Sequence, residues 1–224
     1  MPAFESAVAL GFRYVETDVH ATADGVLVAF HDEALDRVTD RSGLIGELPW
    51  SEVRMARVAG REPIPLMEDI ITTWPHLRVN IDPKHDSAVG PLVDLIGRTG
   101  SVDRVCIGSF SDRRLDRIRE AMGPRLCTSI GPRGIATLKA AGYRLPVRLP
   151  APCAQVPVST RGVVVTDARL VAAAHRLDMQ VHVWTIDDPI EMHRLLDLGV
   201  DGIMTDRPAV LREVLEARGQ WPTT

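Results

Sequence analysis

The chain has 224 residues, of which 45% are hydrophobic and 25% charged, and its formal net charge is -4. This composition predicts a globular protein with a sizeable core, and the acidic balance argues against a nucleic-acid partner, because nucleic-acid-binding domains usually carry a basic face. The chain has no run of about 18 apolar residues and no signal-peptide pattern at its start, so we expect no transmembrane segment and a cytoplasmic location.

The first third of the chain predicts a helix, a hairpin and an irregular segment. Residues 4–10 predict a short amphipathic helix that ends at Gly11. Residues 14–19 predict the first strand, and residues 26–30 predict a second extended run that forms a hairpin with it. The irregular, polar stretch that follows predicts an insertion with one short helix near residues 49–56.

From residue 66 onward, helical stretches alternate with short β-branched stretches, which is typical of βαβ units and a parallel sheet. The predicted helices cover residues 66–74, 87–98, 112–122, 131–141, 167–177, 189–198 and 208–218. The predicted strands cover residues 77–82, 104–110, 126–130, 162–166, 180–186 and 202–205. Asp112 is the expected N-cap of its helix. Residues 143–160 are rich in proline and predict a loop, with a weak strand near Val147.

These elements predict a TIM-type (β/α)8 barrel that lacks its first strand. Setting the hairpin arm aside, seven barrel strands are expected, whereas a closed barrel has eight. Because the chain opens on a helix, we expect the missing strand to precede residue 1. Residues 1–224 are predicted to form a single domain, with a small insertion at about residues 20–62 after the first strand present.

The first predicted strand carries three polar side chains on one face. Side chains alternate along a strand, so Glu16, Asp18 and His20 point in the same direction. Functional groups of a parallel barrel gather at the carboxyl ends of its strands. Two carboxylates there repel each other unless a cation neutralises them, and Ca²⁺ and Mg²⁺ prefer such oxygen ligands. The alternative is a solvated strand face.

Other strand ends carry further candidates. Asp82 ends a strand and Lys84 follows it, so this pair could supply a metal ligand and a phosphate contact, although Asp-Pro also favours a simple turn. His31 could act as a general acid or base, whereas a lone histidine is more often structural. Phe110 and Trp184 could line a substrate pocket or pack across the barrel top.

Taken together, these segments resemble the glycerophosphodiester phosphodiesterase family. The matching pieces follow the family's order across nearly the whole chain: YVETDV at 14–19, TADGVLVAFHD at 22–32, LDRVT at 35–39, IPL at 64–66, NIDPK at 80–84, SF at 109–110, WTI at 184–186 and GVDGIMTDRP at 199–208. No single piece is decisive, but the ordered set is highly specific.

The resemblance implies a metal-dependent barrel enzyme that hydrolyses small-molecule glycerophosphodiesters to glycerol 3-phosphate and an alcohol. By position, Glu16, Asp18 and Asp82 match metal ligands, which implies Ca²⁺ or Mg²⁺ as the cofactor. Asp82 stands where the family usually has Glu, so its side chain is one methylene shorter. His31 matches the second of two acid–base histidines, and Lys84 matches the lysine beside the third ligand.

The sequence departs from the family pattern at its start. The family begins with a strand ending in His-Arg-Gly and a Pro-Glu-Asn-Thr-like segment, and neither occurs here. We therefore expect either a shortened gene model or a catalytically impaired barrel that binds metal or phosphodiester without turnover. Such an impaired barrel could form a homo-oligomer that covers the sheet edge left open by the missing strand. A lysophospholipase D-like phosphodiesterase with the same metal site is a further alternative.

Overall fold

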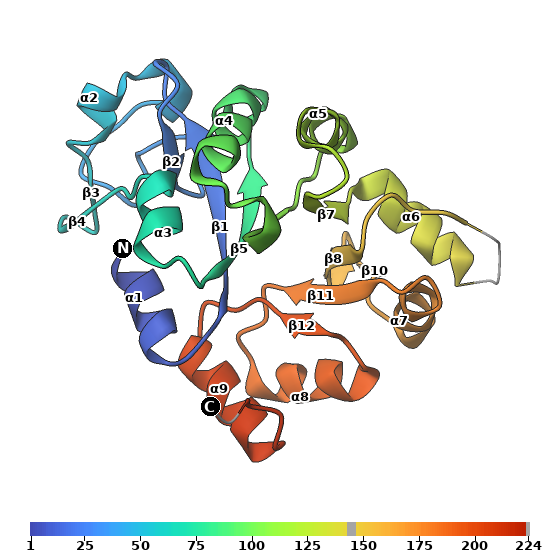
Figure 1. Ribbon diagram of the computed structural model, residues 1–224. Coiled ribbons are helices and arrows are strands. Elements are labelled where there is room, and N and C mark those ends of the chain that lie inside the picture. The colour runs from blue at the N-terminus through green and yellow to red at the C-terminus, as the bar shows by residue number, and fades with distance from the viewer. Residues whose placement is uncertain (143–146, 223–224) are drawn as a thin grey trace. The chain divides into compact units, whose positions relative to one another are not determined.

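The structure, a computed structural model, describes residues 1–142 and 147–222, so residues 143–146 of the predicted loop lie outside the described residues. The chain divides into two compact units, Met1–Cys127 and Thr128–Thr224. Within each unit, parallel strands alternate with helices (Figure 1), which confirms the predicted α/β rhythm. That residues 1–224 form a single domain stays a prediction.

The first unit contains a four-stranded sheet in the order β2-β1-β5-β6. Its strands are β1 (Tyr14–Ala21), β2 (Leu27–Ala29), β5 (Arg78–Pro83) and β6 (Val105–Ile107). β1 pairs antiparallel with β2, which confirms the predicted hairpin, and parallel with β5, which in turn pairs parallel with β6. In Figure 1, β1 is the long blue strand beside β5.

The helices of the first unit are α1 (Pro2–Ala9), α2 (Trp50–Val53), α3 (Met67–Thr73), α4 (Val89–Thr99) and α5 (Asp112–Met122), with 3-10 turns η1 (Ile45–Glu47), η2 (Asp86–Ala88) and η3 (Val102–Arg104). α1 ends as predicted, with Gly11 at φ 94 just beyond it. The N-cap of α5 is Ser111 and not the predicted Asp112, because the Ser111 side chain accepts a hydrogen bond from the backbone N–H of Arg114.

The alternation of side chains along β5 separates the core of this unit from its polar face. Val79 and Ile81 are buried in the core that α3, α4 and α5 cover. Each such burial contributes about 1.5–3 kcal/mol to folding. Asn80 and Asp82 point to the opposite face, where they are only half-buried. Burial of Val79 and Ile81 therefore fixes the orientation of Asn80 and Asp82 on the opposite face.

The segment after the hairpin has a small core of its own, which includes Phe30, Leu35, Ile45, Val53 and Ile64. The predicted short helix is confirmed as α2. Two short strands, β3 (Arg57–Val58) and β4 (Glu62–Pro63), form an antiparallel ribbon that the sequence did not predict.

The second unit contains the strand order β7-β8-β11-β12, and all its neighbouring pairs are parallel. The strands are β7 (Cys127–Ile130), β8 (Cys153–Pro157), β11 (Gln180–Trp184) and β12 (Gly202–Ile203). The helices are α6 (Pro132–Ala141), α7 (Ala168–His175), α8 (Pro189–Leu198) and α9 (Pro208–Ala217). These agree with the predicted helices to within a few residues.

One predicted barrel strand is wrong. Residues 163–164 form β10 (Val163–Val164), which pairs antiparallel with β9 (Ser159–Thr160) in a separate hairpin. The strand beside β11 is instead β8, in the stretch that was predicted to be a loop. Val147 lies in no strand. Pro152 precedes β8 and Pro157 is its last residue, so the composition of this stretch resembles a loop. A proline at the end of a strand is nevertheless compatible with strand pairing.

Candidate functional site

The pairing of β1 with β5 brings two acidic side chains level with each other. In the parallel register, Asp18 lies beside Asp82, and Glu16 lies beside Asn80. All four residues lie on the face of the sheet that the helices leave uncovered, because the buried core residues alternate with them. The Asp18 and Asp82 side chains are only 15% and 13% exposed. Two carboxylates are thus held close together and largely away from water.

Lys84 bridges these two carboxylates. Its Nζ lies 2.6 Å from Asp18 Oδ1 and 3.1 Å from Asp82 Oδ2. Burial disfavours the charged ammonium, but the hydrogen bond to Asp18 and the charge of Asp82 outweigh it, so the pKa of Lys84 is raised. Burial raises the pKa of Asp82, and the neighbouring charge of Lys84 opposes that rise. The charge of Lys84 thus favours the ionised form of Asp82 against the effect of burial.

The second oxygen of Asp82 is incompletely satisfied. Asp82 Oδ1 is buried and has no hydrogen-bond partner among the described residues. A buried carboxylate oxygen without a partner is costly, and a divalent cation is one of the groups that satisfies it. The two carboxylates of Asp18 and Asp82 share the single ammonium group of Lys84. The donor set is all oxygen, which suits Ca²⁺ or Mg²⁺, so these residues fit a divalent cation.

Glu16 completes the predicted ligand set from a more open position. It precedes Asp18 by two residues on β1, so the two side chains share one face of the strand. Glu16 is exposed, in contrast to the two aspartates. The structure brings Asp18, Asp82 and Lys84 into direct contact and places Glu16 at the solvent side of this group.

His31 lies just after β2 and belongs to a chain of three side chains. Its Nδ1 is 2.7 Å from Asp32 Oδ1, and Asp32 accepts two further hydrogen bonds from Arg37, from Nε at 2.5 Å and Nη2 at 2.8 Å. Arg37 first, and then His31, hold the pKa of Asp32 well below its usual range. An ionised Asp32 accepts from Nδ1–H, which leaves Nε2 of the exposed imidazole available for proton exchange.

His20 supports the backbone of His31 from the neighbouring strand. The Nε2 atom of His20 lies 3.2 Å from the His31 carbonyl oxygen, and His20 is only 5% exposed. Burial lowers the pKa of His20. The Phe30 N–H also donates to the Asp18 carbonyl oxygen at 3.0 Å. These contacts tie the segment that carries His31 to the strand that carries Asp18.

The two predicted aromatic residues lie in different units. Phe110 follows β6 in the first unit and is 68% exposed. Trp184 is the last residue of β11 in the second unit and is half-buried. A role for either aromatic residue in substrate binding stays a prediction.

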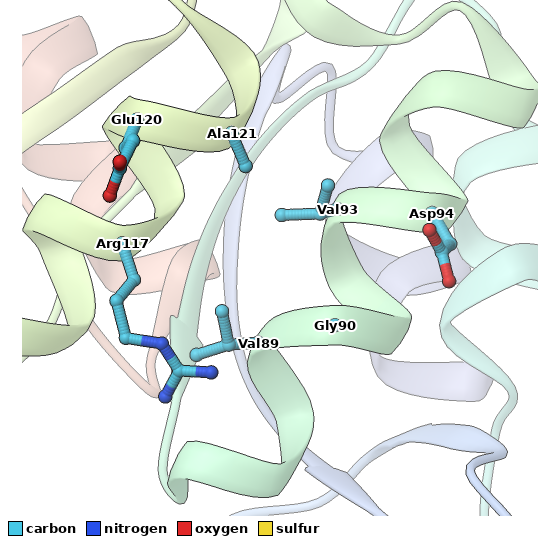
Figure 2. Close-up of a pocket in the computed structure, with 7 residues that line it drawn as sticks. All are labelled: Val89, Gly90, Val93, Asp94, Arg117, Glu120 and Ala121. Atoms are coloured by element: carbon cyan, nitrogen blue, oxygen red, sulfur yellow. The ribbon is translucent and has the colours of Figure 1, made fainter.

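An open hollow of about 330 Å³ lies between α4 and α5 (Figure 2). Its lining residues are Val89, Gly90, Val93, Asp94, Arg117, Glu120 and Ala121. None of them is a predicted site residue, and they lie on the helices and not on the polar face of the sheet. The hollow is therefore separate from the group formed by Asp18, Asp82 and Lys84.

Sequence reasoning missed three contributors to this arrangement. Asp32 and Arg37 were visible only as family matches, although a His-Asp dipeptide before an arginine is a usable local signal. Arg114 left no clear signal, because two of its partners, Asp86 and Pro83, lie 28 and 31 residues earlier in the chain: its Nη1 is 2.6 Å from the Pro83 carbonyl oxygen.

Comparison with known proteins identifies the family. Residues 1–210 match the Glycerophosphoryl diester phosphodiesterase family. A Mycobacterium tuberculosis protein named "Probable glycerophosphodiester phosphodiesterase 2" is 44% identical over 228 aligned positions, which cover 99% of this chain and 86% of that protein. The chain therefore belongs to the glycerophosphoryl diester phosphodiesterase family.

Solved structures show the same fold. A glycerophosphodiester phosphodiesterase from Agrobacterium tumefaciens matches with a TM-score of 0.74 and 22% identity over 93% of this chain and 90% of its own. An Oleispira antarctica phosphodiesterase, solved with its product sn-glycerol-3-phosphate, matches with a TM-score of 0.78 and 20% identity over 96% and 89%. These matches confirm the predicted fold class, that of TIM-barrel phosphodiesterases. Within residues 1–142 and 147–222, no helix is both long and apolar enough to cross a membrane.

Proposed function

We propose that the chain hydrolyses glycerophosphodiesters to glycerol 3-phosphate and an alcohol in a reaction that depends on a divalent cation. The observation that carries this proposal is the group formed by Asp18, Asp82 and Lys84, in which one buried oxygen of Asp82 has no hydrogen-bond partner among the described residues. The family membership and the named M. tuberculosis relative support the reaction class.

The acidic residues are the proposed ligands of the metal. Glu16, Asp18 and Asp82 would hold Ca²⁺ or Mg²⁺, which supplies polarisation of a phosphoryl oxygen and offsets developing negative charge. Lys84 lies between two of these carboxylates and would turn its one remaining N–H donor toward a substrate phosphate. Because Asp82 is shorter than Glu, the site on this strand lies closer to the backbone than in a Glu-containing relative.

His31 is the proposed proton-transfer residue. Asp32 fixes the Nδ1–H tautomer, so the Nε2 atom would exchange a proton with the attacking or leaving oxygen. Such a group, when correctly placed, typically contributes about 10²–10⁴ to the rate. Phe110 and Trp184 are the proposed apolar lining for the substrate. A cytoplasmic location also remains a prediction from the sequence.

The test is hydrolysis of glycerophosphocholine by the 224-residue chain with Ca²⁺ or Mg²⁺, and with excess chelator as the control. We expect metal-dependent release of choline and glycerol 3-phosphate. Release of phosphocholine and glycerol would show cleavage on the glycerol side of the phosphate, which would contradict the proposed reaction. No turnover by a folded chain with either metal would favour the alternative of a binding-only barrel. A parallel assay with lysophosphatidylcholine separates the lysophospholipase D-like alternative, which requires faster turnover of the acylated substrate.

A further inference from the structure

Arg114 leaves the surface of α5 and reaches the loop that carries two site residues. The Ser111 cap fixes the backbone of Arg114 in the first turn of the helix. The Arg114 side chain is only 13% exposed, whereas those of Arg113 and Arg117 on the same helix are 79% and 45% exposed. A largely buried guanidinium requires partners, and Arg114 has three.

The three partners of Arg114 surround the carboxyl end of β5. Nη1 donates to the Pro83 carbonyl oxygen at 2.6 Å and to Ser109 Oγ at 3.0 Å, and Nε donates to Asp86 Oδ1 at 3.1 Å. A planar guanidinium presents its donors in a rigid fork, so three simultaneous bonds define its position and that of its partners. The guanidinium thus joins the end of β5, Ser109 in the segment after β6, and the η2 turn.

The Pro83 carbonyl belongs to the peptide group that joins Pro83 to Lys84. The other polar end of that same peptide group is the Lys84 N–H, which donates to the Val19 carbonyl oxygen at 3.0 Å. The peptide is therefore held from both sides, by β1 through its N–H and by Arg114 through its carbonyl. Rotation of this peptide would move Lys84 away from Asp18 and Asp82.

We propose that Arg114 is a positioning residue, which acts through the Pro83–Lys84 peptide to hold Lys84 and Asp82 in the geometry that binds the metal and the phosphate. The roles of Lys84 and Asp82 toward the metal and the phosphate come from the proposed function. The positioning role of Arg114 is inferred independently, from its own hydrogen bonds. Arg113 and Arg117 approach the same Asp86 carboxylate, at 3.4 Å and 3.6 Å, and Arg117 extends over the hollow of Figure 2.

Arg113 therefore provides a matched control. Arg113→Met removes an arginine next to Asp86 but leaves the Pro83 contact in place, whereas Arg114→Met removes the fork itself. Arg114→Lys keeps a donor that reaches one acceptor at a time, so we expect a partial rescue. The first readout is the exchange rate of the Lys84 backbone amide with deuterium, measured by NMR in each folded variant.

We expect Arg114→Met to accelerate exchange of the Lys84 amide by about tenfold, the typical effect of losing one charge-assisted hydrogen bond, with Leu92 in α4 unchanged. Arg113→Met should leave both amides unchanged. The second readout is calorimetric binding of Ca²⁺ or Mg²⁺, which Arg114→Met should weaken by about 10- to 100-fold, the usual cost of losing a residue that orients a ligand. In hydrolysis, Arg114→Met should lower kcat more than it raises KM.

Unchanged Lys84 exchange in folded Arg114→Met, or an equal effect of Arg113→Met, would overturn the proposal. If Arg114→Met does not fold, NMR of the unmutated chain provides the test. The guanidinium protons of Arg114 should exchange slowly with solvent and show NOEs to Pro83. Fast exchange without these NOEs would contradict the positioning role of Arg114. If the unmutated chain neither binds metal nor hydrolyses the substrate, the proposed function fails, while the amide-exchange result still judges Arg114 independently.

Discussion

His31 depends on two other side chains for its orientation. Asp32 binds its Nδ1, and Arg37 binds Asp32 through two nitrogens. We predict that His31→Gln lowers kcat by about 10²–10⁴ while KM changes little, because the lost group acts on a proton in the transition state. Asp32→Asn should cost less, because it disturbs the tautomer but keeps the imidazole. Steady-state hydrolysis of glycerophosphocholine measures both, and a His31→Gln chain with unaltered kcat would remove His31 from the mechanism.

Arg37 sets the pH range over which Asp32 stays ionised. In the folded chain the pKa of Asp32 is lowered from 3.8, so the contribution of its contacts to stability is present above that value and is lost as pH falls through the lower, folded pKa. Arg37→Gln removes the largest cause of this shift, so we predict that the pKa of Asp32 rises toward 3.8. Carboxyl carbon shifts in an NMR pH titration report this directly. The same low pKa in both chains would show that Arg37 is not the cause.

Candidate site residues could be proposed from the sequence, but the contacts that support them could not. Glu16, Asp18 and Asp82 follow from strand alternation and from the order of short motifs. The contact of Arg114 with Pro83 joins residues 31 positions apart, and it exists only because α5 packs beside the end of β5. A contact between residues so far apart in the chain cannot be predicted from the local sequence pattern.

At the scale of elements, hydrophobic alternation located nearly all helices but misplaced one strand. The run Val163-Val164-Val165 has the β-branched composition of a buried barrel strand, yet Val163 and Val164 are 63% and 55% exposed. The true neighbour of β11 is β8, which has two fully buried residues, Ala154 and Val156. Composition therefore predicted strand formation at residues 163–164 but missed β8, and only tertiary pairing decides which strand enters the sheet.

Close packing of α6 on β7 can be tested at a single glycine. A Cβ added at Gly134 would lie 2.6 Å from the Cβ of Ile130, closer than two carbons can approach. We predict that Gly134→Ala destabilises the chain by about 1–3 kcal/mol, because the helix must shift away from the strand. Free energies of unfolding from urea titration measure this.

Gly97 in α4 is the matched control for this substitution. Its added Cβ would meet no atom within 4 Å. Gly97→Ala should therefore stabilise the chain by about 0.5–1 kcal/mol, because alanine loses less backbone entropy than glycine when a helix forms. If both substitutions stabilised the chain, the close approach of α6 to β7 would be wrong.

At the scale of the whole molecule, the buried Asp82 oxygen that has no hydrogen-bond partner among the described residues predicts that a divalent cation stabilises the fold. A ligand that binds only the folded state, at about 100 times its Kd, adds about 2.7 kcal/mol to the free energy of unfolding. We therefore expect Ca²⁺ or Mg²⁺ to raise the Tm of the chain and a chelator to reverse the rise. Asp82→Asn should lose most of this increase, because it removes the charge beside the unpaired buried oxygen. An equal metal-induced rise in Asp82→Asn would place the cation elsewhere.

We propose that Asp18 and Asp82, which β1 and β5 hold side by side, form the metal-dependent hydrolytic site. The rate of glycerophosphocholine hydrolysis as a function of metal concentration, for the unmutated chain and for Asp18→Ala, tests this role. We predict a saturable, chelator-sensitive rate in the unmutated chain and none above background in Asp18→Ala, with both chains folded. A rate in Asp18→Ala equal to that of the unmutated chain, with the same dependence on metal, would contradict it.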